Sequence, residues 1–191
     1  MRFRLANLYY LWLAFFCFIL PAKLKKGDKT LDVGCGIGNL VWALRKFKID
    51  AYGIEPSVAA KKFSVAPKYC IYTSYNSLPY KNKSFDLVYT NEVLEHIEEK
   101  ELDKNLKEML RVSKNGNIIN IIGVEERGLM ITEEPSHVTV HNEDWWEKKF
   151  TNFKFITRKG NLFYIFPHII PGKTNILSLK KGYFFLIHKP R

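Results

Sequence analysis

The stretch from Leu31 to Leu40, LDVGCGIGNL, constrains the fold of this chain more than any other. It begins as an apolar strand, passes through three glycines at alternate positions and continues into a sequence with helical periodicity. Glycine has no Cβ atom, so the chain can turn tightly here and its backbone N–H groups can approach a ligand directly. A strand, a bare turn and a helix N-terminus in this order predict a Rossmann-like α/β fold with a nucleotide-type ligand at the turn.

The spacing of these glycines argues against a dinucleotide. It reads GxGxG, and Asn39 stands where the GxGxxG fingerprint requires its third glycine, which disfavours an NAD-linked oxidoreductase. Glu55 ends the next expected strand, about twenty residues beyond the glycines, where a carboxylate can accept both hydroxyls of a ribose. A cap on the following helix is the alternative role for Glu55.

Strand-like and helix-like segments alternate along most of the chain. We expect strands at 29–33, 49–54, 69–72, 85–90 and 117–123, and helices at 39–47, 57–66 and 100–112. This alternation predicts a parallel sheet covered by helices on both faces. The last third is expected to contain a helix at 144–150 and strands at 153–158 and 183–188, which can pair antiparallel because no helix has to connect them.

With Asp32 before its first glycine and Glu55 at the next strand end, the chain resembles class I S-adenosyl-L-methionine (SAM) dependent methyltransferases of the small-molecule type. The segment LPYKNKSFDLV at 78–88 is similar to the family stretch that leads from the adenine-binding loop into the fourth strand. The resemblance covers residues 29–123. It implies one domain at 28–191, with a doubly wound seven-stranded sheet that is mostly parallel and has an antiparallel last strand.

The resemblance also implies which residues bind the cofactor. They are Asp32, Gly34, Cys35, Gly36, Gly38, Glu55, Ser74, Tyr75 and Asn91. SAM carries a sulfonium and no pyrophosphate, so its site needs carboxylates, and Asp32 and Glu55 supply them. Ser74 departs from the family, which often has an aspartate here for the adenine amino group; its hydroxyl can make one hydrogen bond, and Tyr75 can stack on the ring.

The segment NEVLEHI at 91–97 offers a candidate metal site. In a helix, Glu92, Glu95 and His96 fall at i, i+3 and i+4 on one face, where they can ligate a divalent metal. Similar arrangements occur in metal-dependent methyltransferases that act on quinone-precursor hydroxyls or on the 3′-terminal ribose of small RNAs, with a further histidine that His137 or His141 would supply here. The alternative is that this segment starts a helix and shapes the pocket without a metal.

His137 and His141 are also candidate catalytic residues without a metal. Methyl transfer to a hydroxyl is an in-line displacement, and a base within hydrogen-bond reach can take the proton as the oxygen attacks. His137 follows the fifth expected strand, at the edge where open α/β sheets place ligands, and is the first candidate. His141 ranks second, because it precedes the helix that carries Trp145 and Trp146 and can have a purely structural role.

Residues 5–22 form an apolar segment with basic residues on both sides. Asn7 is its one strongly polar residue, so it lacks the polar face of a helix that packs on one side. Its eighteen residues are near the short limit for a membrane-spanning helix, which needs about 20. No small-residue cleavage site follows Pro21, so a removed signal peptide is not expected. We therefore expect a separate helical unit at 1–27, either attached to a membrane or buried in the fold or in an oligomer contact.

Charge and composition bear on the partners. The net charge is +11, and residues 148–191 contain ten lysines or arginines and no acid, which favours an anionic surface. The apolar, aromatic segment 161–171 is expected to lie in the region between the last two strands, close to where substrates enter, and can admit a lipid-like acceptor. With the N-terminal segment, it favours an anionic membrane surface, and nucleic acid is the rival partner. Three cysteines without paired spacing fit a reducing cytoplasm.

Together these features predict a SAM-dependent methyltransferase that acts on a hydroxyl, or second on an amine, of a small or lipid-linked acceptor. Two alternatives stay open. One is a non-catalytic subunit of the same fold that binds a partner or a membrane, which the departure at Ser74 supports. The other is a metal-dependent RNA 2′-O-methyltransferase. The sequence fixes neither the acceptor nor the oligomeric state.

Overall fold

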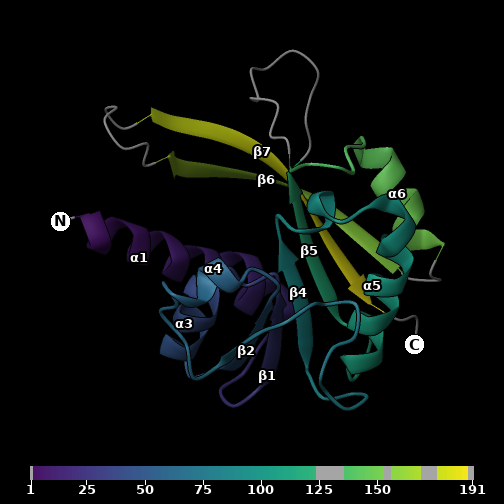
Figure 1. Ribbon diagram of the computed structural model, residues 1–191. Coiled ribbons are helices and arrows are strands. Elements are labelled where there is room, and N and C mark those ends of the chain that lie inside the picture. The colour runs from purple at the N-terminus through teal and green to yellow at the C-terminus, as the bar shows by residue number, and fades with distance from the viewer. Residues whose placement is uncertain (1, 124–135, 153–155, 169–175, 189–191) are drawn as a thin grey trace.

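A single mixed sheet organises the chain. The computed structural model describes residues 2–123, 136–152, 156–168 and 176–188 (Figure 1). Within these residues, seven strands form one sheet in the order β3-β2-β1-β4-β5-β7-β6. Their bounds are β1 (Lys29–Val33), β2 (Asp50–Glu55), β3 (Cys70–Tyr72), β4 (Leu87–Asn91), β5 (Ile118–Gly123), β6 (Ile156–His168) and β7 (Ile176–His188).

Strands β1 to β5 are parallel, which confirms the predicted Rossmann-like α/β class. β1 pairs with β2 on one side, where Val33 is opposite Ile54, and with β4 on the other. The strand order therefore reverses direction between β1 and β4. In open α/β sheets ligands bind outside the carboxyl ends of the strands at this reversal, so the fold places a site beyond Val33 and Asn91.

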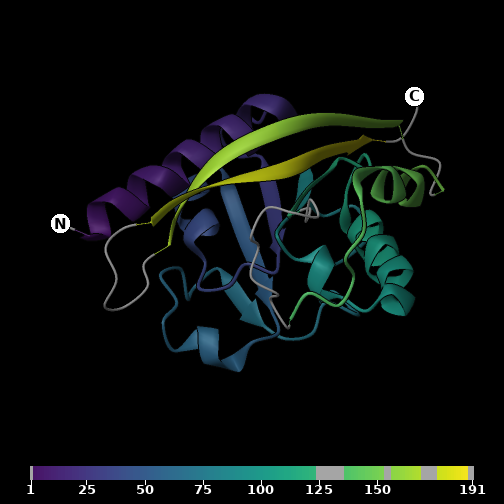
Figure 2. The same ribbon diagram turned by 90° about the horizontal axis from the view of Figure 1, so that it is seen from above.

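Helices cover both faces of the sheet (Figure 2). They are α1 (Arg2–Leu13), η1 (Ala14–Ile19), α2 (Leu20–Ala22), α3 (Asn39–Lys46), α4 (Val58–Lys61), η2 (Leu94–His96), α5 (Glu99–Val112) and α6 (Glu143–Thr151). The N-terminal helices α1, η1 and α2 lie on one face together with α3, and α5 and α6 lie on the other face. In α5, Leu102, Leu106 and Met109 recur at helical spacing and are buried against the sheet, because this stripe is its only apolar face.

The N-terminal segment has one face in the core. Leu13, Ala14, Cys17 and Phe18 are buried together with residues of α3, and the Phe18 ring centroid lies 4.4 Å from that of Tyr89. The helical segment ends at Lys23, which has a left-handed φ of 54°. Within the described residues, no helix combines the length and the apolar character that a membrane crossing requires.

Two regions differ from the sequence-based expectations. The helix expected at 57–66 is shorter, because the N–H of Val65 donates to Ile37 and that of Ala66 to the Ser64 hydroxyl, which ends the helical bonding. The expectation that 161–171 lies between the last two strands is wrong for its described part, since residues 161–168 belong to β6. Residues 153–155 and 169–171 of these expectations lie outside the described residues.

The last two strands extend beyond the rest of the sheet. β7 pairs antiparallel with β5 over residues 182–187, whereas β6 and β7 pair antiparallel along their whole length. Their outer parts therefore continue as a two-stranded ribbon. Figures 1 and 2 both show this ribbon running out over the side of the sheet that carries α1.

Candidate active site

The glycine loop is fixed by its contacts with β2 and with the segment after β4. The N–H groups of Gly34 and Cys35 both donate to the Ile54 carbonyl, at 2.8 and 3.0 Å. Gly34 has a φ of 86°, and a Cβ atom on it would lie 2.4 Å from a methyl carbon of Val93. Gly36, with a φ of 53°, has open space where its Cβ would be. The first glycine is therefore required by packing, and the second leaves room for a ligand.

Glu55 links this loop to the next helix. Its Oε2 accepts the Gly36 N–H at 2.8 Å, and its Oε1 accepts the Ser57 N–H at 2.8 Å. The cap of α4 is Ser57, whose hydroxyl accepts the Ala60 N–H, and Glu55 supports this cap by accepting the N–H of Ser57. A carboxylate offers about four acceptor positions, and two remain for hydroxyl groups of a ligand.

A pocket of about 290 Å³ opens at the carboxyl ends of β1 and β4. Its lining consists of the glycine loop, the start of α3, one strand end and one side chain from α1: Tyr10, Asp32, Gly34, Cys35, Gly36, Ile37, Asn39, Leu40 and Asn91. Five of the predicted cofactor residues therefore line this pocket. Tyr10 was not predicted, because nothing in the sequence near the glycines indicates that the N-terminal helix reaches them.

Asp32 gives this pocket a buried carboxyl group. Burial raises its pKa well above the usual range, the charges of Cys70 and Glu55 raise it further, and the Tyr89 hydroxyl lowers it. Burial disfavours the ionised form of Asp32, and a cationic ligand in the pocket would stabilise that ionised form. The electrostatics of the pocket therefore favour a positively charged ligand.

The remaining predicted cofactor residues have different positions. Gly38 is the N-cap residue of α3, and a Cβ on it would lie 3.0 Å from the Cys70 sulfur, so it serves packing. Ser74 is exposed, and its hydroxyl accepts the N–H of Asn76. Tyr75 is half-buried; burial raises its pKa, and so does the charge of Glu55. Tyr75 does not line the pocket described above, and its place beside the ligand's base stays a prediction.

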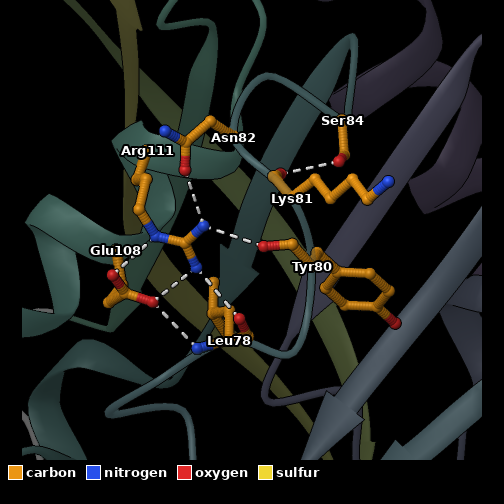
Figure 3. A network of polar contacts seen from close by, with 7 residues as sticks. All are labelled: Leu78, Tyr80, Lys81, Asn82, Ser84, Glu108 and Arg111. Carbon is orange, nitrogen blue, oxygen red and sulfur yellow. Dashed lines mark hydrogen bonds and ion pairs between the residues drawn. The ribbon is translucent and has the colours of Figure 1, made fainter.

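A clamp on α5 fixes the connection that follows Tyr75 (Figure 3). The Arg111 guanidinium donates to both carboxylate oxygens of Glu108 at 2.8 Å, to the carbonyls of Leu78 and Tyr80, and to Asn82 Oδ1. Glu108 also accepts the Leu78 N–H at 2.9 Å. The LPYKNKSF stretch is therefore a loop that is held in place through its backbone groups, which bond to Arg111 and Glu108.

The segment after β4 does not form the expected helix. Glu92 has a left-handed φ of 54°, its N–H donates to Ile121, and a short 3₁₀ turn follows at Leu94–His96. The prediction that Glu92, Glu95 and His96 share a helix face is therefore wrong. Burial raises the pKa of Tyr9 and Tyr10, and the charge of Glu92 raises both further, so this carboxylate is on the α1 side.

A different group of three side chains comes together instead. Potential ligand atoms of Glu95, His96 and His137 all lie within 4.8 Å of one another, and the two imidazole centroids are 4.6 Å apart. The backbone builds this group, because the N–H groups of Val138 and Thr139 donate to the Glu95 carbonyl at 2.9 and 3.0 Å. His137 is thereby brought to the end of β4, while His96 Nδ1 lies 3.0 Å from the Ser136 carbonyl.

His141 lies apart from this group. Its Nε2 is 3.0 Å from Glu99 Oε2, and its ring stacks on Trp145 with centroids 3.7 Å apart. Trp146 is buried in the core and the partly buried Trp145 packs against the same cluster, so α6 packs on the sheet through its tryptophans. The structure thus gives the two candidate histidines different surroundings.

Known proteins are similar to this chain in sequence and in fold. The family described as methyltransferase domain matches residues 31–121. Norajmaline N-methyltransferase of Rauvolfia serpentina is 34% identical over 120 residues, which are 58% of this chain and 40% of that protein. The ubiquinone/menaquinone biosynthesis C-methyltransferase UbiE of Xylella fastidiosa is 29% identical over 161 residues, 76% of this chain and 57% of that protein. This chain therefore spans about half, or less, of the length of these relatives.

A solved structure extends the likeness to almost the whole fold. A SAM dependent methyltransferase from Archaeoglobus fulgidus has a TM-score of 0.74 at 17% identity, covering 96% of this chain and 94% of that one. The sheet with its glycine loop, acidic strand end and pocket thus defines a Rossmann-like α/β domain. In sequence over residues 31–121 and in fold over almost the whole chain, this protein is similar to class I SAM-dependent methyltransferases.

Proposed function

We propose that this chain binds SAM in the pocket at the end of β1 and transfers its methyl group to a hydroxyl of a small or lipid-linked acceptor. The observation that carries the proposal is the loop held by Glu55, with Asp32 in the pocket wall and open space at Gly36. An amine is the second choice of acceptor group, and the N-methyltransferase relatives support it.

The residues present fit SAM. When bound, SAM supplies a methyl group on a sulfonium, which carries a positive charge. Asp32 would balance that charge in the pocket, Glu55 would accept the ribose hydroxyls, and Asn91 and Tyr10 would enclose the methionine side. Gly38 and Cys35 shape the loop, whereas Ser74 is proposed to bind only at its outer edge.

On the acceptor side, His137 is our first choice for the base. It lies beside Glu95 and His96 at the end of β4, and an imidazole there can take the proton of an attacking hydroxyl. Most of the rate enhancement would come from aligning nucleophile, methyl carbon and sulfur. His141 is engaged by Glu99 and Trp145, so we assign it a structural role.

Calorimetric titration with SAM and with S-adenosylhomocysteine tests the cofactor. We expect micromolar binding by the wild type and its loss in Glu55→Ala, because that change removes the acceptor of the Gly36 and Ser57 N–H groups. Glu98→Ala is the matched control, since its carboxylate pairs with Lys100 at the surface. Failure of the wild type to bind either ligand would contradict the proposal and favour the non-catalytic subunit.

A metal-dependent reaction, including RNA 2′-O-methylation, is a second candidate. The group of Glu95, His96 and His137 favours it, since one carboxylate and two imidazoles are suitable ligands for a divalent metal. Titration with Mn²⁺ or Zn²⁺ checks this directly. Binding that is lost in His96→Ala and retained in His141→Ala would support it, and absence of binding by the wild type would overturn it.

A further inference from the structure

The N-terminal segment presents an apolar stripe on its outer side. Five side chains are between 38% and 62% exposed and recur at helical spacing: Leu8, Trp12, Phe15, Phe16 and Leu20. The Trp12 and Phe16 rings are 5.5 Å apart, and Phe15 and Phe16 are 5.1 Å apart. Large apolar residues grouped in this way usually mark an interaction site, since single exposed ones are ordinary but a continuous patch is not.

The stripe continues onto the end of α3. The Phe47 ring lies 5.8 Å from Phe15 and is 38% exposed. It is flanked in the sequence by the exposed Lys46 and Lys48. The outer stripe, as we call these six residues, therefore runs from the N-terminal helical segment to the end of α3.

Lysines gather at one end of the outer stripe. Lys23, Lys25 and Lys26 are exposed, and the next residue, Gly27, donates its N–H to the Lys48 carbonyl at 3.0 Å. This bond brings the two groups of lysines together. No acid occurs in residues 1–27.

The acids nearest to these lysines in the sequence already have partners. Asp28 accepts the Lys25 N–H at 2.7 Å. Asp50 accepts from Arg45 at 2.9 Å and from the Tyr52 hydroxyl at 3.1 Å. A backbone N–H leaves the charge of Asp28 in place, so this one carboxylate offsets part of the charge of the five lysines and the region stays positive.

We propose that the outer stripe docks this protein on an anionic lipid bilayer, with the N-terminal helix lying in the plane of the interface. Aromatic and aliphatic side chains would enter the boundary between headgroups and acyl chains, and the lysines would contact anionic headgroups. Spanning is excluded for this packing, because Leu13, Ala14, Cys17 and Phe18 on the opposite face are buried against the sheet domain. The proposal does not depend on the methyltransferase activity.

Charge complementarity selects lipid over a second copy of the chain. A two-fold contact between two copies would set positive charge against positive charge, because residues 1–27 have basic residues at both ends and contain no acid. An anionic membrane offers the opposite charge and an apolar interior on one surface.

Vesicle flotation of the full chain tests the proposal. We expect binding to phosphatidylcholine vesicles that contain phosphatidylglycerol and about tenfold weaker binding to phosphatidylcholine alone. The double variant Trp12→Ser/Phe16→Ser should weaken binding about tenfold or more. Phe63→Ser is the matched control, because Phe63 is 72% exposed on the α4 side and outside the stripe, and it should bind within about twofold of the wild type. Lys25→Gln/Lys26→Gln should weaken binding to the anionic vesicles several-fold.

A measurement on the unsubstituted protein covers the case in which a variant fails to fold. Brominated acyl chains should quench the Trp12 fluorescence, and Trp12→Phe should remove the quenched component, while Trp146 stays unquenched because it is buried. Binding that is equal for wild type and the double variant would overturn the proposal. So would a dimer in light scattering that the double variant dissolves while no vesicle binding is seen.

Discussion

The two halves of the candidate site are held together in different ways. In the cofactor half, Asp32–Gly38 with Glu55, backbone N–H groups of the glycine loop donate to the Ile54 carbonyl and to the Glu55 carboxylate. The acceptor half consists of Asn91–Ile97 and Ser136–His141. Here the Glu95 backbone carbonyl accepts two N–H groups, and the imidazole rings of His96 and His137 contact each other.

This difference determines what each half tolerates. The glycine loop requires left-handed backbone and the absence of a Cβ at Gly34, so its residues cannot change without moving the backbone. In the acceptor half the backbone bonds do not depend on which side chains stand at His96 and His137. We infer that such a site can change its acceptor chemistry while its cofactor half stays the same.

The largest expected effect is in the cofactor half. Gly34→Ala should lower the free energy of unfolding by about 2–4 kcal/mol, because the new Cβ would overlap Val93 and the φ of 86° is unfavourable for alanine. Gly36→Ala is the matched variant and should cost about 1 kcal/mol, since only the backbone conformation opposes it. Urea unfolding of both proteins measures this difference, and equal stabilities would contradict our account of the loop.

The next effect concerns the clamp beside the cofactor half. Arg111→Lys keeps the charge but loses the planar set of donors, and we expect a loss of about 2 kcal/mol in the free energy of unfolding. Lys107→Ala, at an exposed position on the same helix, should change it by less than about 0.5 kcal/mol.

The Arg111 contribution should also depend on pH. The hydrogen bonds from Arg111 hold the pKa of Glu108 below its usual range, so the stabilisation is present above the unfolded pKa of about 4.3 and is lost as the pH falls through the folded value. The stability difference between wild type and Arg111→Lys should therefore shrink in acid. A difference that is constant with pH would show that the ion pair is not its source.

A smaller effect tests whether the N-terminal helix belongs to the cofactor half. Tyr10→Ala removes one wall of the pocket and should weaken binding of S-adenosylhomocysteine about fivefold, corresponding to about 1 kcal/mol. Leu8→Ala, on the exposed side of the same helix, is the control and should leave the dissociation constant unchanged. Calorimetry that gives the same constant for all three proteins would remove Tyr10 from the site.

The smallest effect is expected from the acceptor half. His137→Ala should leave the dissociation constant for S-adenosylhomocysteine within about twofold of the wild type, because His137 does not line the pocket beside the glycine loop. With a methyl acceptor in hand, the same variant should lower kcat. A tenfold loss of cofactor affinity would mean that the two halves are not separate.

Sequence reasoning was most successful where neighbours in the chain are neighbours in the site. The glycine loop and Glu55 follow from one strand, one turn and the next strand end, and parallel pairing of β1 with β2 places them together. Tyr10 and the turn at Glu92 could not be predicted in this way, because each depends on packing against a distant segment: the pocket in one case, β5 in the other.

The cysteines illustrate the same limit. Their spacing shows no pair, yet β3 aligns Cys70 with Gly53, and a Cβ on that glycine would lie 2.5 Å from the Cys35 sulfur and 3.1 Å from the Cys70 sulfur. The missing side chain of Gly53 is what makes room for both sulfurs. Only the register of the sheet reveals this, and the sequence alone does not specify it.

The N-terminal helix contributes Tyr10 to the pocket on one side and carries Trp12 and Phe16 on the other. If a contact on the outer face of this helix changes the affinity for the cofactor, thermodynamic linkage requires that bound cofactor change the affinity for that contact by the same factor. A surface that tightens cofactor binding by some factor must itself be bound more tightly, by the same factor, when the cofactor is present. Any coupling through this helix between the cofactor pocket and the outer stripe would therefore act equally in both directions.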